Sequence, residues 1–258
     1  KPASLFSHEK EEASPGYYKC YLEDYKVGVE LSVSQRSGMH KYVFENIENA
    51  RILLDLKHRD LTTNAEIIQV SNTEIQGYRY SANWASDQRI FFAMEFNQEI
   101  ASVENGSEVK LVDKNGDTIS KILQTELFFD LKDNSEVLVK IGISSVDIEG
   151  AVKNLQQEIP DWDFDKLKTS ANEIWEKQLS KVIVTGGTEK QQVTFYSAMY
   201  HSFIAPNIYS DVDGRYRGRD LKIHTSESDY YTVFSLWDTY RTTHPLFTVL
   251  EEKRTQDF

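Results

Sequence analysis

The chain has 258 residues, of which 40% are hydrophobic and 27% are charged, as expected for a globular protein of one or two domains. Its formal net charge of -12 disfavours a polyanionic partner such as nucleic acid. No run of 18 apolar residues occurs, so no membrane span is predicted, and the single Cys20 excludes an internal disulfide.

The first part of the chain is predicted to be a β-sandwich. After a polar and aromatic start, Val27, Val29, Leu31 and Val33 alternate with smaller or polar residues, which is typical of a half-buried strand. Further strands are predicted at 41–44, 51–57, 65–71, 74–80, 89–96, 110–112, 126–131 and 136–143. Eight or nine strands with no long helix between them indicate an antiparallel sandwich over residues 1–146.

The hydrophobic period becomes helical near residue 147. The first helical pattern is formed by Ile148, Val152, Leu155 and Ile159. Asp161 or Asp163 can cap a second helix, and Thr188 can cap a third over residues 189–205 that Pro206 ends. A β domain is therefore followed by a helical connector and the beginning of an α-helical domain.

Trp84 stands in a polar loop between two predicted strands. One interpretation is that its ring folds back onto the sandwich, because tryptophan is usually largely buried. The other is that the ring is a stacking platform for a ligand, and we expect it to face the helical part of the chain.

The stretch SDVDGRYRGRD, residues 210–220, contains carboxylates around Gly214 and superficially looks like a calcium loop. The EF-hand order requires further ligands and a bidentate Glu that are absent, so a turn stabilised by its own carboxylates is the better interpretation. A third interpretation is a loop at the rim of a pocket, in which the charges of Arg215, Arg217 and Arg219 balance those of the acids. The six histidines show no zinc-binding spacing.

The last stretch, residues 230–258, has the period of an amphipathic helix, with a bend or restart expected at Pro245. Asp238 and Arg241 fall three residues apart inside its apolar pattern, where they are neighbours on a helix. They are either a structural ion pair or a ligand-holding pair at a pocket mouth. Trp237 beside the carboxylate favours the second interpretation, since carbohydrate sites combine aromatic plates with charged acceptors.

Three motifs resemble those of a known family in their residue sequence and in their order along the chain. They are FSHEKEEASPGYY, FYSAMYHSFIAPNIYSDVDGRYRGRD and YYTVFSLWDTYRTTHPLFTVL, and together with DQRIFFAMEF they resemble glycoside hydrolase family 92, the exo-acting α-mannosidases. The resemblance implies a β-sandwich at 1–146, a helical linker at 147–187, and at 188–258 the first helices of an α/α toroid. The chain would then be the truncated N-terminal portion of a larger enzyme.

The resemblance also implies an activity and its residues. The family members look like calcium-dependent, inverting enzymes that release terminal mannose from glycans and are secreted, periplasmic or on the cell surface. Asp238 resembles a sugar-binding carboxylate, with Trp237 and Arg241 as its neighbours, and Trp84 looks like the aromatic that the sandwich lends to the site. No catalytic pair and no metal ligand can be carried over, so the general acid, the general base and most calcium ligands are expected beyond Phe258.

The expected partners are a mannose-containing glycan and the remainder of the catalytic domain. Two other functions are weighed against the mannosidase. One is a non-catalytic carbohydrate-binding sandwich with a helical appendage, and the other is a structural or adhesion domain in which Asp238 and Arg241 form only an ion pair. The truncated helical array disfavours the binding module, because such a module should end with its sandwich.

Overall fold

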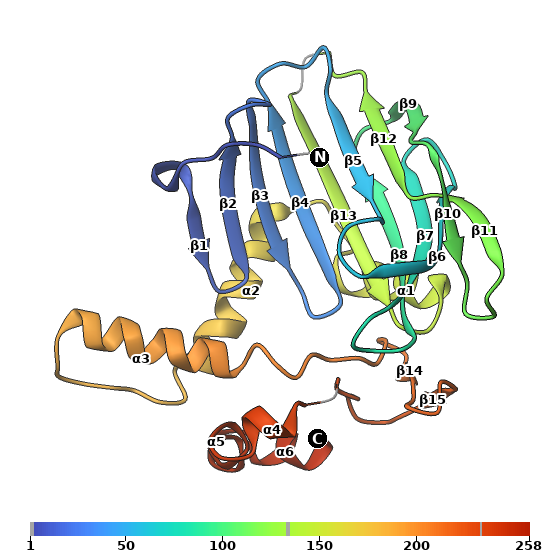
Figure 1. Ribbon diagram of the computed structural model, residues 1–258. Coiled ribbons are helices and arrows are strands. Elements are labelled where there is room, and N and C mark those ends of the chain that lie inside the picture. Colours follow the sequence, from blue (N-terminus) through green and yellow to red (C-terminus); the bar gives the residue numbers. More distant parts are fainter. Residues whose placement is uncertain (1–2, 133–134, 233) are drawn as a thin grey trace.

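The computed structural model describes residues 3–132, 135–232 and 234–258. It has a sandwich of two unequal sheets, two helices packed on the outside of the larger sheet, and a helical C-terminal part lying beyond one end of the strands (Figure 1). The expected mixed fold, an antiparallel sandwich followed by helices, is confirmed.

The larger sheet is antiparallel and has eight strands in the order β1-β2-β3-β4-β13-β8-β7-β6. Its strands are β1 Glu12–Ser14, β2 Tyr17–Leu22, β3 Val27–Val33, β4 Ser37–Phe44, β6 Leu61–Gln69, β7 Glu74–Ala82, β8 Gln88–Phe96 and β13 Glu136–Ser144. Alternating side chains sort to its two faces, so that Val137 and Val139 face the sandwich interior while Leu138 packs on the opposite face.

The smaller sheet covers only part of the inner face of the larger one. It contains β5 Arg51–Asp55, β12 Gln124–Phe129 and β9 Ile100–Asn105, in that order, beside a hairpin of β10 Glu108–Val112 and β11 Thr118–Ile122. The core between the sheets includes Ala65, Ile75, Phe96, Leu127 and Val137, each at most 2% exposed. Burying a large apolar side chain of this kind contributes about 1.5–3 kcal/mol.

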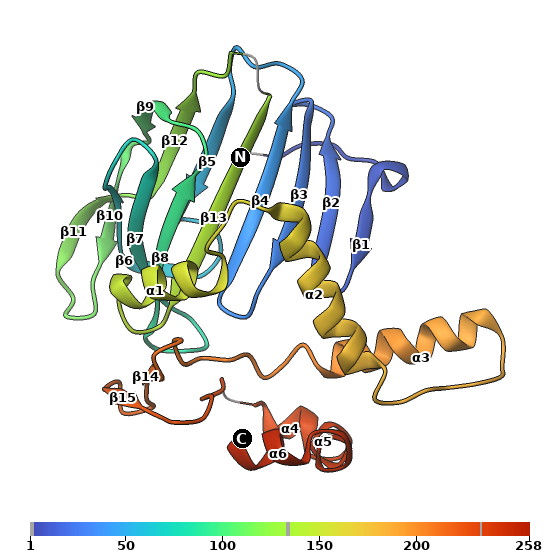
Figure 2. The same ribbon diagram turned by 180° about the vertical axis from the view of Figure 1, so that it is seen from behind.

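Two helices cover the outer face of the larger sheet, as Figure 2 shows from behind. Helix α1, Ile148–Glu158, packs on β13 and β8, and α2, Phe164–Leu179, packs on β2, β3 and β4. The second core is made by Tyr17, Met39, Leu138, Leu155, Ile159, Phe164 and Leu167. Both helices begin at aspartate caps: Asp147 accepts the amide of Gly150 at 2.7 Å, and Asp163, one of the two residues predicted to cap the second helix, accepts that of Lys166 at 2.9 Å.

The third helix, α3 Glu189–Ser202, begins at Thr188. Thr188 and Gln191 form a capping box, in which each side chain bonds the backbone of the other. A long loop follows and includes the small hairpin of β14 Arg215–Arg217 and β15 Ile223–Thr225. A short 3-10 helix, η1 His8–Lys10, lies near the start of the chain.

The C-terminal stretch was predicted to be an amphipathic helix that bends or restarts at Pro245, and in the structure the helix restarts two residues earlier, at Thr243. The stretch forms three short helices, α4 Leu236–Thr239, α5 Thr243–Leu250 and α6 Glu252–Asp257, while Val233 lies outside the described residues. The first break falls before Pro245, which occupies the first turn of α5. An amide is not needed for an intrahelical bond at that place, so the proline is compatible with a helix start.

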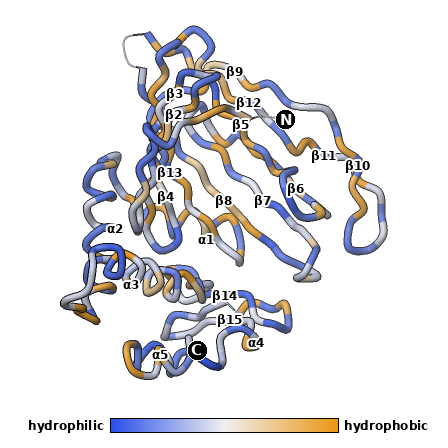
Figure 3. The backbone as a smooth tube through the Cα atoms, turned by 60° about the vertical axis from the view of Figure 1, so that its left-hand side comes forward, coloured by the Kyte–Doolittle hydropathy of each residue, from blue (hydrophilic) through white to orange (hydrophobic). Residues whose placement is uncertain are grey.

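The sandwich and the later chain are joined by a polar network around Arg36, in the turn between β3 and β4. The Arg36 guanidinium bonds Glu158 at 2.9 Å, Asp229 at 3.0 Å and the carbonyl of Ser210 at 2.6 Å. The Arg36 and Glu158 side chains are only 10% and 11% exposed, so this contact is stronger than a surface ion pair. Figure 3 shows hydrophobic and hydrophilic residues interleaved along the strands of the sandwich.

Candidate functional site

Trp84 is carried by the loop between β7 and β8, at the end of the sandwich nearest the C-terminal part (Figure 1). The residue is 92% exposed, so the prediction of a loop position is confirmed and the core interpretation is wrong. The loop itself is held by polar contacts. The Asn83 side chain donates a hydrogen bond to Asp60 at 3.0 Å. The Asp87 carboxylate accepts two hydrogen bonds from the Arg89 guanidinium, at 2.9 and 2.8 Å.

A pocket of about 410 Å³ lies between this loop and the segment that surrounds β14 and β15. Its lining comprises Asp60, Asn83, Trp84, Ala85, Asp87, Gln88, Tyr209, Arg217, Gly218, Arg219, Tyr230, Tyr231 and Thr232. We call this the junction pocket. The aromatic wall is ordered, since the Tyr230 ring stacks on Tyr216 with centroids 3.8 Å apart and planes 12° apart. An aromatic and amide lining of this kind suits a ligand with both apolar faces and hydroxyl groups.

The charge of the junction pocket is balanced around Asp87. The Asp87 carboxylate contacts Arg89 and also lies 3.6 Å from the guanidinium of Arg217. The hydrogen bonds from Arg89, with smaller contributions from the two positive charges, lower the pKa of Asp87. Asp87 therefore stays ionised at neutral pH and is unsuited to act as a general acid.

The loop at residues 210–220 is anchored to the sandwich, with its first carboxylate buried. Asp211 is 3% exposed and accepts the Ser144 hydroxyl at 2.7 Å and the Asn154 amide at 2.8 Å. Burial raises the pKa of Asp211 despite these bonds. The Asp213 carboxylate accepts the Arg215 amide at 3.2 Å and the Arg215 guanidinium at 2.9 Å, so the interpretation of a turn whose carboxylates bond its own backbone holds for Asp213 but not for Asp211. Of the three arginines expected to balance these acids, Arg217 instead contacts Asp87 of another loop.

These carboxylates do not fit a calcium ion. Asp211 is already bonded by Ser144 and Asn154, and Asp213 is paired with Arg215 and Lys153. Within residues 3–132, 135–232 and 234–258, no group of three or more His, Cys, Asp or Glu side chains is placed to hold a metal. Calcium prefers six to eight oxygen ligands, which this part of the chain does not bring together.

Trp237, Asp238 and Arg241 lie on and just after α4, away from the lining of the junction pocket. Trp237 is 88% exposed, and the Asp238 carboxylate accepts the Ser235 hydroxyl at 2.6 Å. Arg241 is directed to the Tyr240 side chain instead. The predicted Asp238–Arg241 ion pair is therefore absent from the described residues, because the helix ends at Thr239 and the one-turn spacing is lost.

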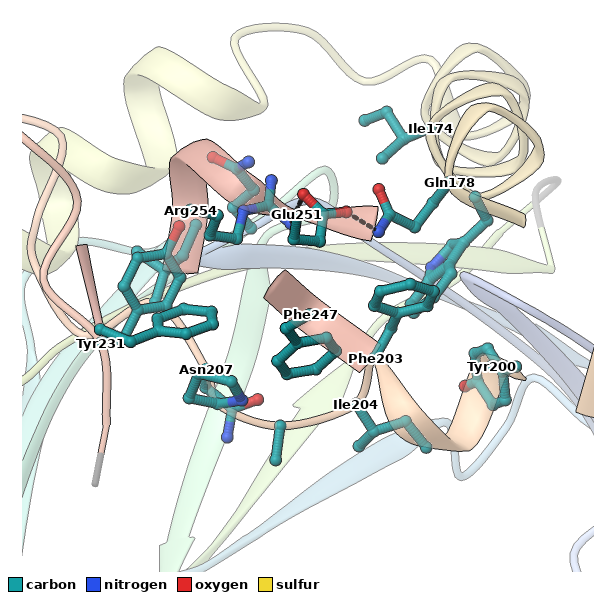
Figure 4. A pocket seen from close by; sticks show the side chains of 16 residues that line it. Ile174, Gln178, Tyr200, Phe203, Ile204, Asn207, Tyr231, Phe247, Glu251 and Arg254 are labelled. Atoms are coloured by element: carbon teal, nitrogen blue, oxygen red, sulfur yellow. Dashed lines mark hydrogen bonds and ion pairs between the residues drawn. The ribbon is translucent and has the colours of Figure 1, made fainter. Parts of the chain in front are cut away.

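A second pocket, of about 320 Å³, separates α2 from α5 and α6 (Figure 4). Phe203 stacks on Phe247 with centroids 5.6 Å apart, and Gln178 and Glu251 point toward one another across it. Burial acts to raise the pKa of Glu251, but hydrogen bonds from Lys181 and Gln178 outweigh it and lower the pKa. The largely apolar lining and this internal ion pair indicate a packing junction between helices.

Sequence reasoning found Trp84 and suggested that the loop of Arg217 and Arg219 lies at the rim of a pocket, as it does, but it missed the contact between Arg217 and Asp87. Asp87 and Arg217 are 130 residues apart in the chain and meet only in the fold. A weak signal was present, since Arg215 and Arg217 alternate along a strand-like segment. That alternation could have predicted a hairpin whose side chains reach different carboxylates. Nothing in the local sequence identifies Asp87 as the partner.

Comparisons with known proteins cover both parts of the chain. The family model described as the glycosyl hydrolase family 92 N-terminal domain matches residues 1–144, and that of the family 92 catalytic domain matches residues 150–258. Among curated proteins, an uncharacterized secreted glycosidase of Arthroderma benhamiae is 24% identical over 89% of this chain and 32% of its own length.

Solved structures give the same result. The family 92 α-mannosidase BT3965 of Bacteroides thetaiotaomicron is 32% identical with a TM-score of 0.87, over 98% of this chain and 35% of its own. The inverting mannosidase BT2199 of the same organism is 25% identical with a TM-score of 0.80, over 95% of this chain and 33% of its own. The chain thus spans about a third of the length of these relatives. Since the N-terminal domain model alone matches more than half of the 258 residues, the chain belongs to glycosyl hydrolase family 92.

Proposed function

We propose that this chain is the N-terminal part of a secreted, periplasmic or cell-surface exo-α-mannosidase that hydrolyses terminal α-linked mannose from glycans. The observation that carries the proposal is the position of Trp84. It is 92% exposed and lines a pocket shared by the sandwich and the segment that follows the linker helices. BT3965 has also been solved in complex with mannoimidazole, a mannose-like ligand, which supports mannose as the sugar.

The proposed role of Trp84 is to stack on a sugar ring. Pyranose rings carry apolar C–H faces, and an exposed indole offers a flat surface of matching size. Asp238 is proposed to hold sugar hydroxyls, because a carboxylate accepts two of them through strong charge-assisted bonds. Trp237 and Arg241 would flank it. All three side chains are exposed on the C-terminal part, so they are available to a ligand or to further chain.

The catalytic pair is proposed to lie outside this chain. An inverting glycosidase needs a carboxylic acid and a carboxylate about 6.5–9.5 Å apart, with a water between the base and the sugar. The carboxylates at the junction pocket are instead held in ion pairs or hydrogen bonds. Calcium is likewise proposed to be bound by residues outside this chain. The 258-residue chain alone is expected to be inactive.

The remainder of the catalytic domain is proposed to pack on the C-terminal helices. Val193 on α3, Leu236 on α4 and Val249 on α5 are 60%, 62% and 78% exposed. Large aliphatic side chains at this exposure are available for packing against further helices. No helix of the described chain is long and apolar enough to cross a membrane.

The whole protein provides the test. Incubation with glycans carrying terminal α-linked mannose should release free mannose, and proton NMR of an aryl α-mannoside reaction should show the β-anomer first. Initial release of the α-anomer would contradict inversion. Absence of any mannose release, with retained binding to immobilised mannan, would contradict the enzyme and support a carbohydrate-binding module instead.

A further inference from the structure

The carboxylate of Asp87 connects two parts of the chain. On one side it receives the Arg89 guanidinium at 2.9 and 2.8 Å, within the sandwich. On the other side its Oδ2 atom lies 3.6 Å from a guanidinium nitrogen of Arg217, which belongs to β14. Asp87 is also the last residue of the loop between β7 and β8, and Trp84 lies in this loop three residues before it. A change in the contact between Asp87 and Arg217 therefore acts directly on the Trp84 loop.

Arg217 is buried to an extent that a surface ion pair does not explain. Its side chain is 7% exposed, and among the described residues its Nε atom has no hydrogen-bond partner. A buried guanidinium with an unmade hydrogen bond costs free energy, which must be compensated elsewhere. The negative charge of Asp87 is the compensation that the described contacts offer. Stability alone gives no reason to prefer an arginine here over an apolar residue of similar size.

The strand that carries Arg217 is itself firmly attached. Arg215, two residues earlier, bonds the carboxylate of Asp147 at 2.7 and 3.2 Å, and Asp147 is the N-cap of α1. Asp211 is fixed by Ser144 and Asn154, as described above. Arg217 therefore projects from a rigid base, whereas the exposed Trp84 depends on its loop for its position.

We infer that Arg217 is a positioning residue, which holds the Trp84 loop through Asp87 and so sets the orientation of the indole in the junction pocket. This inference rests on the proposed function of Trp84 as a sugar platform. The pair also links the sandwich to the segment following the linker helices. Arg217 acts through Trp84 and is not assigned a contact with the sugar.

The first experiment needs no substrate. Hydrogen exchange of the whole protein is followed by mass spectrometry in wild type and Arg217→Met, with peptides covering residues 78–90 and 27–44. Methionine fills the buried space without a charge, and Asp87 keeps Arg89, so the variant should fold. Exchange should rise in 83–88 and stay unchanged in 27–44. Unchanged exchange at 83–88 would overturn the inference, whatever the activity of the protein.

The second experiment is a double-mutant cycle on hydrolysis of an α-mannoside glycan. Arg217→Met should raise KM about 3- to 30-fold with little change in kcat, since contacting residues couple on this scale and the platform binds ground and transition states alike. In a Trp84→Ala background the same substitution should change KM less than about twofold. Equal effects in both backgrounds would overturn the inference, because Arg217 would then act independently of Trp84.

Two controls complete the design. Arg51→Met removes another arginine–carboxylate pair, with Glu126 at 3.1 Å in the smaller sheet, and should change neither KM nor exchange at 83–88. If Arg217→Met does not fold, Asp87→Asn replaces it in both experiments, because the amide keeps the shape of the link without its charge. If Asp87→Asn changed KM equally in the wild-type and Trp84→Ala backgrounds, the inference would also be overturned. Complete absence of mannosidase activity would instead contradict the proposed function, and hydrogen exchange would still test the positioning.

Discussion

Asn154 should be among the most sensitive positions for stability. It is fully buried in α1, where its amide group donates to the Ile143 carbonyl at 2.8 Å and to Asp211 at 2.8 Å and accepts the Val212 amide at 2.9 Å. Asn154→Ala leaves the Val212 N–H without a partner and removes one bond each from the other two groups. An orphaned amide costs about 1–3 kcal/mol, and the lost neutral and charged bonds about 0.5–1.5 and 1.5–3 kcal/mol.

The expected loss of unfolding free energy is about 3 kcal/mol, which is the total of the lower limits of these three contributions. The lower limits apply because Val212 is only partly buried and water can enter the vacated space. For a chain of this size the melting temperature should fall by about 6–12 °C in a thermal scan followed by circular dichroism. Asn46→Ala is the matched control, since Asn46 is exposed and its side chain accepts the nearby Glu48 amide. A decrease below about 2 °C for Asn154→Ala would refute the reasoning.

Asn154→Asp tests the electrostatic part of the same argument. It places a second carboxylate beside Asp211, whose pKa burial already raises. Two neighbouring buried carboxylates cannot both ionise easily, so both pKa values should lie above their unfolded values. A raised folded pKa gives stability that is present at low pH and lost as pH rises through the folded value. The variant should therefore be closer to wild type at pH 4 than at pH 8, and a pH-independent difference would contradict this account.

The remaining predictions concern the site and the sheet. Trp84→Ala in the whole protein should weaken substrate binding with a melting temperature within about 2 °C of wild type, because so exposed a ring contributes little to packing; a large loss of stability would favour a packing role. Asp238→Asn should lower kcat/KM roughly 10- to 150-fold on an aryl α-mannoside without rescue by azide; rescue would make Asp238 a catalytic base. Gly77→Ala should destabilise by about 1–3 kcal/mol, as its Cβ would lie 2.1 Å from the Glu66 carbonyl, whereas an unchanged melting temperature would contradict the close approach. Calorimetric titration of the 258-residue chain with calcium should show no binding tighter than about 1 mM, and a micromolar site would contradict the assignment of the ligands elsewhere.

Local sequence signals predicted much of the sandwich and its helices. Alternation in β3, the caps of the second and third helices at Asp163 and Thr188, and the polar surroundings of Trp84 are short-range features that act within a few residues. Strands β1, β2, β9 and β11 were not predicted. Strand β2 shows no clear apolar–polar alternation, because both of its faces are packed: Tyr17 belongs to the core under the helices and Cys20 packs against the core between the sheets.

The candidate site was harder to predict because its contacts are long-range. Asp211 reads locally as a turn residue, and only the fold shows that Ser144 and Asn154 enclose it. The apolar period around Trp237 predicted a helix that continues to a bend or restart at Pro245, but the helix already breaks at residues 240–242, and the Arg241 side chain bonds Tyr240. A periodic pattern identifies which residues share a face, but it does not establish that the backbone remains helical across them.

The Arg36 network has a consequence for protein engineering. The domain boundaries suggest exchanging the sandwich between members of this family by cutting at the linker helices. Such a chimera would separate Arg36 from Glu158 on α1 and from Ser210 and Asp229 in the later loop. A graft that preserves the buried guanidinium must also transfer the end of α1 and residues 209–232. The smallest exchangeable unit is therefore discontinuous in sequence, and recombination points chosen from domain boundaries alone would produce unstable hybrids.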